Sequence, residues 1–284
     1  MKILLTGNEG FIGKNLETEL TSQGHDVIGF EKDCTISDIV EEMHSNPVVV
    51  HQGAITDTLY PDNIEMMVNN YEFSKRLFDE AFSRNIKVVY ASSAACYGIS
   101  DEGTPANIYG WSKYCAEQYG LALYKPQTIL SPFSNVNSKA QFIALRYYNV
   151  FGMGEEHKGR MSSIAYQAMV KGSMTLFPGQ PRRDFVYVKD VVRANLHAIT
   201  NNYIKTGYYD VGSGVASTFE DVCDNLEVPY THTSEDNIPE GYQFFTKSSE
   251  EKWLPGWEPK YDLKTALKEY KESYTEAIFP QKIL

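Results

Sequence analysis

The chain has 284 residues, of which 42% are hydrophobic and 22% are charged, and its formal net charge at pH 7 is −11. These values are typical of a globular protein with one large domain or two small ones, and the negative charge argues against nucleic acid or an anionic membrane as the main partner. No apolar run approaches the roughly 18 residues that a membrane span requires, so we expect a cytoplasmic protein with no membrane partner.

Strand and helix patterns alternate along the first half of the chain. The sequence predicts helices at 11–23, 36–44, 63–84 and 109–124, a loop or hairpin at 126–139, and strands at 2–6, 26–30, 48–50, 87–91 and 141–147. Strands that alternate with helices favour a parallel sheet with helices on both faces. We therefore predict an α/β fold, a Rossmann-type doubly wound parallel sheet with a smaller C-terminal substrate-binding region.

The elements predicted beyond Gly152 are shorter and richer in loops. We expect residues 1–150 to form a dinucleotide-binding domain that also carries the Ser/Tyr/Lys site described below. Residues 151–284 are expected to be mainly a substrate-binding region, with some elements returning to the main sheet. The four cysteines show no C-x-x-C spacing, so neither a disulfide framework nor a metal site is indicated.

A glycine-rich run, 7–13, follows the first predicted strand and opens the first helix with the spacing G-x-x-G-x-x-G. Glycine allows a tight turn and a close approach of the backbone to a pyrophosphate, whose charge a helix N-terminus favours. The second strand ends at Glu31, near the position where an acidic residue binds the adenosine ribose. Glu31 favours NAD and would repel the 2′-phosphate of NADP, whereas the adjacent Lys32 would attract that phosphate. An ordinary strand-end carboxylate is the alternative interpretation.

Two further segments are candidates for contact with the dinucleotide. His51 and Gln52 precede the small residues Gly53 and Ala54, where the backbone could pass under a cofactor. Asn69 is a polar residue inside the long helix predicted over 63–84, where it would hold either a loop or the cofactor.

Tyr109 and Lys113 are four residues apart on a predicted helix, and Ser93 lies at the end of the preceding strand. Positions i and i+4 share one helix face, so the lysine ammonium can lie beside the phenol. A nearby cation lowers the pKa of a tyrosine and suits it to act as a general base near neutral pH. Ser93 would then bond the oxygen of the substrate. A surface helix pair is the alternative for Tyr109 and Lys113.

Several short sequence motifs together resemble those of the extended short-chain dehydrogenase/reductases that modify nucleotide-activated sugars. Among these enzymes, the resemblance is to the ADP-glycero-manno-heptose 6-epimerases. The resemblance runs from Lys2 to about Trp253. It is carried by Asn69-Asn70-Tyr71, Tyr90–Ala95 with Tyr97-Gly98, Asn107–Lys113, Arg146-Tyr147 with Asn149-Val150, His157–Gly159, Arg183–Val188, and Tyr242-Gln243 with Phe245-Thr246.

The resemblance implies an NAD- or NADP-dependent epimerase that acts on a nucleotide-diphosphate-sugar, holds its cofactor tightly and forms a homo-oligomer. It would oxidise a sugar carbinol transiently and return the hydride to the opposite face. Its catalytic residues would be Ser93, Tyr109, Lys113 and Lys158. Its cofactor contacts would be Gly7, Gly10, Phe11, Ile12, Gly13, Glu31, Lys32, Gln52, Gly53, Ala54, Ile55, Thr56, Asn69, Tyr109, Lys113 and Val150. Its substrate contacts would be Ser93, Asn149, Arg160, Gln167, Phe177, Arg183 and Tyr242.

The chain departs from the family pattern near the sugar. Arg160 and Gln167 replace a serine and a histidine at substrate-facing positions. Pro178 interrupts the nucleotide-contact motif just after Phe177. The stretch between Glu31 and Val48 is shorter than in the family, in which it includes another strand near the adenine. The loop between Gly98 and Tyr109 is also shorter.

Three other functions stay open at this point. A 4,6-dehydratase usually has an acidic residue just after the catalytic serine, where this chain has Ala94 and Ala95. An epimerase-reductase resembling GDP-L-fucose synthase would use Cys96 and His157 as its acid/base groups, although a cysteine of this kind is more often a small buried residue than a catalyst, and His157 is also explained as a residue that orients a loop. A non-catalytic NAD(P)-binding sensor would keep the fold without the chemistry.

Overall fold

The computed structural model describes residues 1–99, 103–124, 140–238 and 242–278. The loop or hairpin predicted at 126–139 therefore lies outside the described residues. The chain forms two compact units, one of residues 1–146 with 195–209 and one of residues 147–194 with 210–284. The chain passes into the second unit just after Arg146, so Asn149 and Val150 belong to the second unit rather than to the first.

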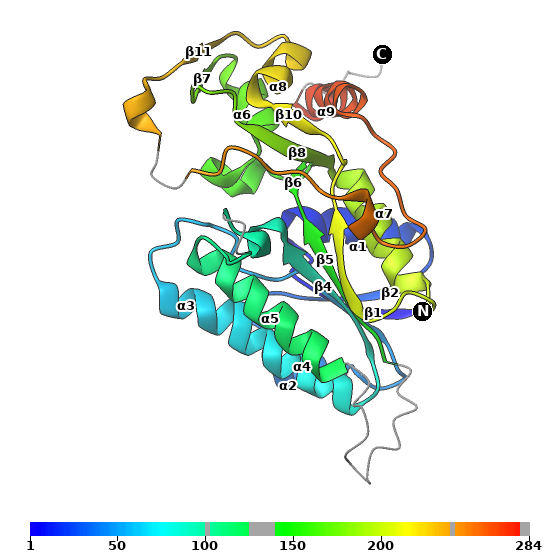
Figure 1. Ribbon diagram of the computed structural model, residues 1–284. Coiled ribbons are helices and arrows are strands. Elements are labelled where there is room, and N and C mark those ends of the chain that lie inside the picture. The colour runs from blue at the N-terminus through cyan, green and yellow to red at the C-terminus, as the bar shows by residue number, and fades with distance from the viewer. Residues whose placement is uncertain (100–102, 125–139, 239–241, 279–284) are drawn as a thin grey trace, which may run out of the picture. The chain divides into compact units, whose positions relative to one another are not determined.

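A six-stranded sheet forms the centre of the first unit (Figure 1). Its order is β2-β1-β3-β4-β5-β9, and β1 pairs in parallel with β2 and β3, as β3 does with β4. The strands are β1 (Lys2–Thr6), β2 (Asp26–Phe30), β3 (Val48–His51), β4 (Lys87–Ser93), β5 (Phe142–Tyr147) and β9 (Gly207–Val211). Parallel strands covered on both faces are almost continuously apolar, as β3 and β4 are here. The predicted α/β fold with a parallel sheet is confirmed.

Helices cover both faces of this sheet because successive right-handed crossovers run outward from β1 in opposite directions. Figure 1 shows α3, α4 and α5 together on one face and α1 on the other. The helices of this unit are α1 (Phe11–Ser22), α2 (Ile36–Glu41), α3 (Asn63–Met67), α4 (Phe73–Ser83) and α5 (Ile108–Tyr124), with a 3₁₀ turn, η2 (Ala94–Tyr97). No strand lies between β2 and β3 in the described residues, in keeping with the short stretch between Glu31 and Val48.

The long helix predicted over 63–84 is present, but it contains a π-helical turn. This turn, η1 (Val68–Glu72), joins α3 to α4 without a break. Such turns are rare. Their hydrogen bonds span five residues instead of four, so the turn holds one extra residue and the side chains that follow change direction. Asn69 and Asn70 both lie in this turn, and their side chains have different surroundings, as described below.

The core of the first unit lies between the sheet and the α4–α5 pair. Phe78 of α4 meets Phe142 of β5 edge to face, with ring centroids 4.9 Å apart. Gly120 of α5 lies directly over the same ring, where an added Cβ would be 2.2 Å from a Phe142 carbon. The absence of a side chain at Gly120 therefore sets how closely α5 approaches the sheet, and α5 carries both Tyr109 and Lys113.

The second unit contains two small sheets. One has the order β10-β8-β6, from β10 (Ala216–Thr218), β8 (Arg182–Tyr187) and β6 (Asn149–Phe151), and the other joins β7 (Met174–Leu176) to β11 (Tyr230–His232). The helices are α6 (Ile164–Lys171), α8 (Phe219–Leu226), α9 (Leu263–Ile278) and the first part of α7 (Val188–Thr200), with 3₁₀ turns η3 (Glu156–Met161), η4 (Glu235–Asn237) and η5 (Glu250–Lys252). These short elements agree with the loop-rich pattern expected beyond Gly152.

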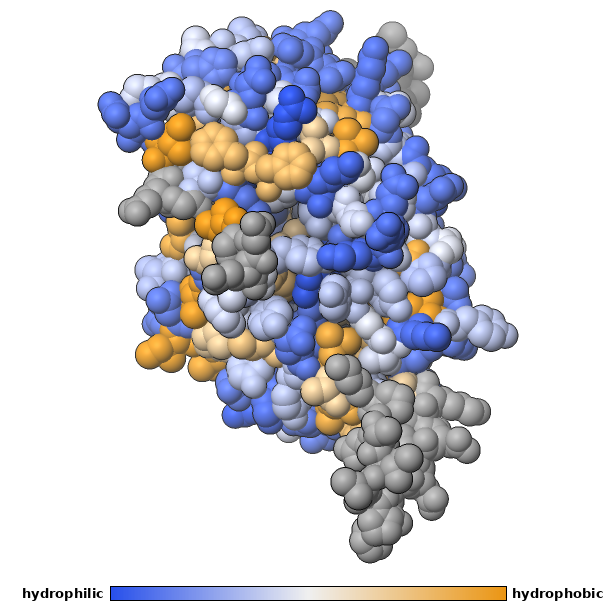
Figure 2. All heavy atoms as spheres, viewed as in Figure 1, coloured by the Kyte–Doolittle hydropathy of each residue, from blue (hydrophilic) through white to orange (hydrophobic). Residues whose placement is uncertain are grey.

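Most of the surface in Figure 2 is hydrophilic, with separate hydrophobic areas. One exposed apolar pair lies on the outer side of α3 and η1, where Ile64 is 78% exposed and Val68 is 52% exposed. Among the described residues, no helix combines the length and the apolar character needed to cross a membrane.

Candidate active site

In the glycine-rich turn after β1, the glycine backbone lies too close to neighbouring backbone atoms to leave room for side chains. Gly7 has a φ of +70°, and a Cβ there would lie 2.7 Å from Gly53, whereas a Cβ on Gly13 would lie 1.9 Å from the Gly7 carbonyl oxygen. Gly10 is the N-cap residue of α1 and offers no side-chain hydrogen bond to the helix. The first-turn N–H groups of α1 therefore have no capping side chain, which suits a pyrophosphate at this position.

Glu31 lies beside this turn. Its Oε1 accepts a hydrogen bond of 2.7 Å from the backbone N–H of Glu9. The half-buried carboxylate thus stands at the carboxyl edge of the sheet, at the end of β2, while Lys32 is exposed. The turn and this carboxylate together fit a dinucleotide with an unmodified adenosine ribose.

The segment 52–56 follows β3 at the same edge of the sheet, and it is held by Asn70. The Asn70 side chain accepts from the Ile55 N–H at 2.8 Å, donates to the Ile55 carbonyl at 2.9 Å, and donates to Ser112 Oγ at 3.0 Å. The side chain of Asn69 is exposed and donates to the carbonyl of Glu65 in its own helix, at 2.9 Å. In this structure the residue that holds a loop is therefore Asn70 and not Asn69.

Ser93, Tyr109 and Lys113 meet at the carboxyl end of β4. The hydroxyl of Tyr109 lies near that of Ser93, and Ser93 Oγ accepts a hydrogen bond of 3.1 Å from the Ala95 N–H. Lys113 is buried, and its Nζ donates to the Ala91 carbonyl at 2.8 Å. Tyr109 and Lys113 thus lie one turn apart on α5, near the end of the strand that carries Ser93.

The pKa of Tyr109 differs from the sequence-based prediction. Burial raises the pKa of Tyr109 to about 12, although the nearby Ser93 hydroxyl lowers it. The ammonium of Lys113 is itself costly to bury, and its own pKa falls to about 8. The prediction of a lowered tyrosine pKa is therefore wrong, because the loss of hydration on burial outweighs the effect of the Ser93 hydroxyl.

Lys158 lies in the 3₁₀ turn η3 of the second unit, and Glu155 anchors this turn. Glu155 is fully buried and accepts hydrogen bonds from Gly152 N at 3.1 Å, from Ser163 Oγ at 2.7 Å and from the Tyr270 hydroxyl at 3.1 Å. The Lys158 N–H donates to the Glu155 carbonyl at 3.0 Å. Burial lowers the pKa of Lys158, while the charge of Glu155 opposes this shift. A lysine with a lowered pKa is suited to proton transfer.

The two residues that depart from the family pattern contact each other. Gln167 Nε2 donates to the Ser162 carbonyl at 2.9 Å and lies 3.5 Å from the carbonyl oxygen of Arg160. Gln167 Oε1 accepts from Lys171 at 3.0 Å. Gln167 thus ties α6 to the segment that carries Lys158, while Arg160 is exposed.

Three predicted substrate residues gather in the second unit. The Arg183 guanidinium lies 5.2 Å from the centroid of the Tyr242 ring, and the Tyr242 and Phe177 rings meet edge to face at 5.1 Å. Burial lowers the pKa of Arg183, and Tyr242 opposes this shift. A guanidinium among aromatic rings suits a ligand that has both phosphate oxygens and a planar base. Asn149 and Val150 lie on β6, which pairs with β8.

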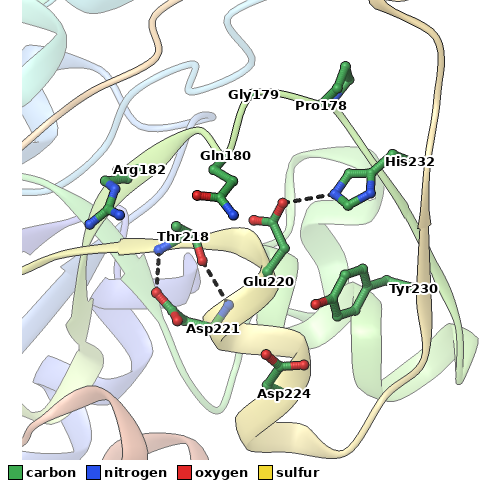
Figure 3. Close-up of a pocket in the computed structure, with 10 residues that line it drawn as sticks. All are labelled: Pro178, Gly179, Gln180, Arg182, Thr218, Glu220, Asp221, Asp224, Tyr230 and His232. Carbon is green, nitrogen blue, oxygen red and sulfur yellow. Dashed lines mark hydrogen bonds and ion pairs between the residues drawn. The ribbon is translucent and has the colours of Figure 1, made fainter.

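A separate pocket of about 530 Å³ lies in the second unit (Figure 3). Arg182 lines this pocket, whereas Arg183 follows it in β8 and therefore points to the other face of the strand. Figure 3 shows the Glu220 carboxylate turned to His232, with Oε1 and Nε2 2.9 Å apart. None of its lining residues is a predicted catalytic, cofactor or substrate residue; they are Pro178, Gly179, Gln180, Arg182, Thr218, Glu220, Asp221, Asp224, Tyr230 and His232.

Comparison with known proteins identifies the family. Residues 3–212 match the profile of the NAD dependent epimerase/dehydratase family. The chain belongs to this family. The matched range includes the glycine-rich turn, Ser93, Tyr109, Lys113 and Arg183, and it covers most of the chain. The prediction of an NAD- or NADP-dependent nucleotide-sugar epimerase is confirmed at the level of the family, which is NAD-dependent.

Similar proteins cover almost the whole chain. The ADP-L-glycero-D-manno-heptose-6-epimerase of Brachyspira hyodysenteriae is 31% identical over 95% of this chain and 96% of its own length. The crystal structure of the Helicobacter pylori ADP-L-glycero-D-manno-heptose-6-epimerase is 25% identical, with a TM-score of 0.80 over 96% of this chain and 95% of that one. MoeE5 in complex with UDP-glucuronic acid and NAD has the same fold, with 20% identity and a TM-score of 0.80 over 98% of this chain and 100% of that one.

Sequence reasoning overlooked two residues beside the catalytic candidates, Asn70 and Glu117. Asn70 belonged to a polar run inside a helix, but the sequence does not indicate a π-helical turn. Glu117 continues the spacing of four residues that starts at Tyr109 and Lys113. That periodicity was the available signal, because a carboxylate on the buried face of a helix requires a partner.

Proposed function

We propose that this enzyme is an NAD-dependent nucleotide-sugar epimerase of the ADP-glycero-manno-heptose 6-epimerase type. The observation that carries the proposal is the meeting of Ser93, Tyr109 and Lys113 at the end of β4, in the unit that contains the glycine-rich turn and Glu31. The similarity to heptose epimerases over nearly the full chain supports the choice of substrate class.

In the proposed reaction, the chain's own residues position the sugar and move protons. Ser93 holds the oxygen of the reacting carbon by a hydrogen bond, and Tyr109 removes the proton of that hydroxyl. The ammonium of Lys113 lies near Tyr109 and stabilises the phenolate as the proton leaves. NAD, when bound, accepts a hydride from the carbon and later returns it. Because the hydride is returned in each turnover, no external reductant is needed.

Inversion requires that the ketone presents its other face before the hydride returns. For a carbinol on the sugar side chain, rotation about one carbon–carbon bond is sufficient. Lys158 then protonates the oxygen in its new position, and its lowered pKa makes it a stronger acid than an exposed lysine. The arrangement around Glu155 supports this role, because it fixes the backbone on which Lys158 stands.

The nucleotide diphosphate would bind to the second unit. Arg183 offers a planar fork to the phosphate oxygens, and Phe177 and Tyr242 offer ring faces to the base. Arg160 and Gln167 would define the sugar end of the site. Since Gln167 is bonded to the backbone of the Lys158 segment, we expect it to shape this segment rather than to contact the sugar directly.

We propose NAD as the cofactor, retained through purification. The half-buried Glu31 beside the glycine-rich turn supports NAD over NADP, because its charge would repel a 2′-phosphate.

Cys96 argues against the epimerase-reductase alternative. Its side chain is 1% exposed and lies 3.5 Å from Ser92 Oγ. Burial raises the pKa of the Cys96 thiol, and the neighbouring Glu117 raises it further. A buried thiol with a raised pKa is poorly suited to proton transfer with a substrate.

The proposal is tested with a panel of ADP-, GDP-, UDP- and dTDP-sugars. Mass spectrometry detects dehydration or reduction, and NMR detects epimers, which share a mass. The expected product is an epimer of an ADP-activated heptose. A product lighter by one water would instead identify a dehydratase, and the absence of turnover with all of the sugars would support a non-catalytic protein.

A further inference from the structure

A buried carboxylate stands behind the catalytic candidates. Glu117 lies on the same face of α5 as Tyr109 and Lys113, one further turn along the helix, and it is fully buried. Its Oε2 accepts a hydrogen bond of 2.6 Å from Ser92 Oγ. One stripe of α5 therefore faces three consecutive residues of β4: Lys113 bonds Ala91, Glu117 bonds Ser92, and the Tyr109 side chain lies near that of Ser93.

The charge of Glu117 is balanced by Arg146 of β5. Arg146 is also buried, and it forms a two-pronged pair in which Nη2 lies 2.5 Å from Glu117 Oε1 and Nε lies 2.9 Å from Oε2. The guanidinium lies between two rings, 4.2 Å from the centroid of Tyr97 and 3.9 Å from that of Tyr208. The pair thus joins α5 to β4, β5 and β9, and to the 3₁₀ turn that begins just after Ser93.

Stability alone is a weak explanation for this pair. Removing two charges from water is costly, and buried ion pairs are often replaced by apolar side chains of similar volume without loss of stability. Geometry is a better explanation. The fork of a guanidinium fixes the direction of both carboxylate oxygens, and one of these oxygens fixes Ser92, the residue adjacent to Ser93.

We propose that Glu117 and Arg146 are positioning residues that set the register of α5 on β4, and with it the position of Ser93 relative to Tyr109. Neither residue is expected to touch the substrate. This inference rests on the proposed function insofar as Ser93 and Tyr109 act together in catalysis. The geometric part of the inference concerns the protein without substrate.

The test uses a double variant, Glu117→Leu with Arg146→Met, which replaces the ion pair by apolar side chains, and a mild variant, Ser92→Ala. Both are expected to keep the thermal midpoint and the NAD content close to those of the wild type. Both are expected to lower kcat on the order of 10- to 100-fold, because small misplacements of reacting groups have such effects, with a much smaller change in KM. Glu117→Gln keeps an acceptor for Ser92 and should recover part of the rate. The matched control is Glu80→Gln, which removes an exposed carboxylate paired with Arg84 on α4.

A second measurement needs no substrate. The Ala95 amide donates to Ser93 Oγ, so its hydrogen exchange reports whether the Ser93 side chain is held in place. We expect exchange at Ala95 to increase about tenfold in the double variant, while exchange in the β4 strand stays unchanged. If a stable double variant keeps the wild-type kcat and the wild-type hydrogen exchange at the Ala95 amide, the inference is overturned. If the wild-type protein turns over no nucleotide sugar, the proposed function fails, and exchange at Ala95 still decides whether the pair positions Ser93.

Discussion

The ammonium of Lys113 donates a hydrogen bond of 2.8 Å to the carbonyl oxygen of Ala91, two residues before Ser93. Lys113 is buried and Tyr109 is half-buried, and the two residues lie one turn apart on the same face of α5. The pKa of Tyr109 is raised and that of Lys113 is lowered, in both cases mainly by burial. The raised pKa keeps the Tyr109 phenol neutral near pH 7.

Tyr109→Phe removes the oxygen that transfers the proton and leaves the shape of the side chain almost unchanged. We expect kcat to fall on the order of 10²-fold or more, with little change in the binding of the nucleotide sugar. Steady-state rates and calorimetric titration measure the two effects separately. Tyr119→Phe is the control, because Tyr119 is a hydroxyl on the same helix that bonds Asp79 instead. Near-normal turnover of Tyr109→Phe would exclude Tyr109 as the principal base.

Glu31→Ser should change the cofactor preference. The variant removes the carboxylate that repels a 2′-phosphate, so we expect tighter binding of NADP and weaker binding of NAD, with a combined change in preference of about tenfold or more. Asp33→Ser, which removes an exposed carboxylate two residues along the chain, should leave the preference unchanged. The dissociation constants of NAD and NADP, measured for the wild type and both variants, give the cofactor preference. An unchanged ratio would mean that Glu31 does not face the ribose.

Gly7→Ala should weaken NAD binding by about tenfold or more, because the new Cβ would meet the Gly53 backbone at 2.7 Å and the turn would have to move. Gly24→Ala is the matched control, since Gly24 also has a positive φ, +77°, but a Cβ there meets nothing within 4 Å. The control should lower the free energy of unfolding by about 1 kcal/mol without affecting NAD binding. Equal NAD affinity in the two variants would contradict the assignment of the glycine-rich turn.

Lys113 should make the stability of the free protein depend on pH in a defined direction. Burial lowers its pKa to about 8, whereas an unfolded lysine titrates near ~10.4. Between these values the unfolded chain binds more protons, so the contribution of Lys113 raises the free energy of unfolding as the pH rises from about 8 to about 10, by at most ~1.4 kcal/mol per pH unit. Urea unfolding of wild type and Lys113→Met across this range gives the difference. Lys14→Met, which removes an exposed lysine, is the control. If the free energy of unfolding of Lys113→Met rises with pH as steeply as that of the wild type, the prediction is contradicted.

The sequence predicted the fold of the first unit well because local signals agreed there. Apolar runs, helical periodicity and a glycine-rich turn after the first strand all indicate alternating elements and a parallel sheet. The spacing of Tyr109 and Lys113 places both residues on one helix face whatever the tertiary structure. The end of the preceding strand then brings Ser93 to them, because carboxyl ends of parallel strands meet at one edge.

Other features depend on tertiary contacts and could not be read from the sequence. Asn70 and not Asn69 holds Ile55, because Asn70 is the one that faces the buried side of the helix. The direction of the pKa shift of Tyr109 depends on how deeply α5 is buried, which Gly120 and Phe142 determine together. The contact between Gln167 and the backbone near Arg160 depends on how the 3₁₀ turn meets α6.

The most direct test of the proposed function follows the sugar and the cofactor in one sample. The sugar is monitored by NMR and the reduced cofactor by absorbance, for wild type and for Lys158→Met. If the enzyme is a self-contained epimerase, the wild type interconverts two epimers of the sugar with no net consumption of NADH or NADPH, and Lys158→Met slows this conversion although Tyr109 is still in place. Stoichiometric consumption of the reduced cofactor, with rates that depend on Cys96 or His157, would contradict the proposal and identify an epimerase-reductase.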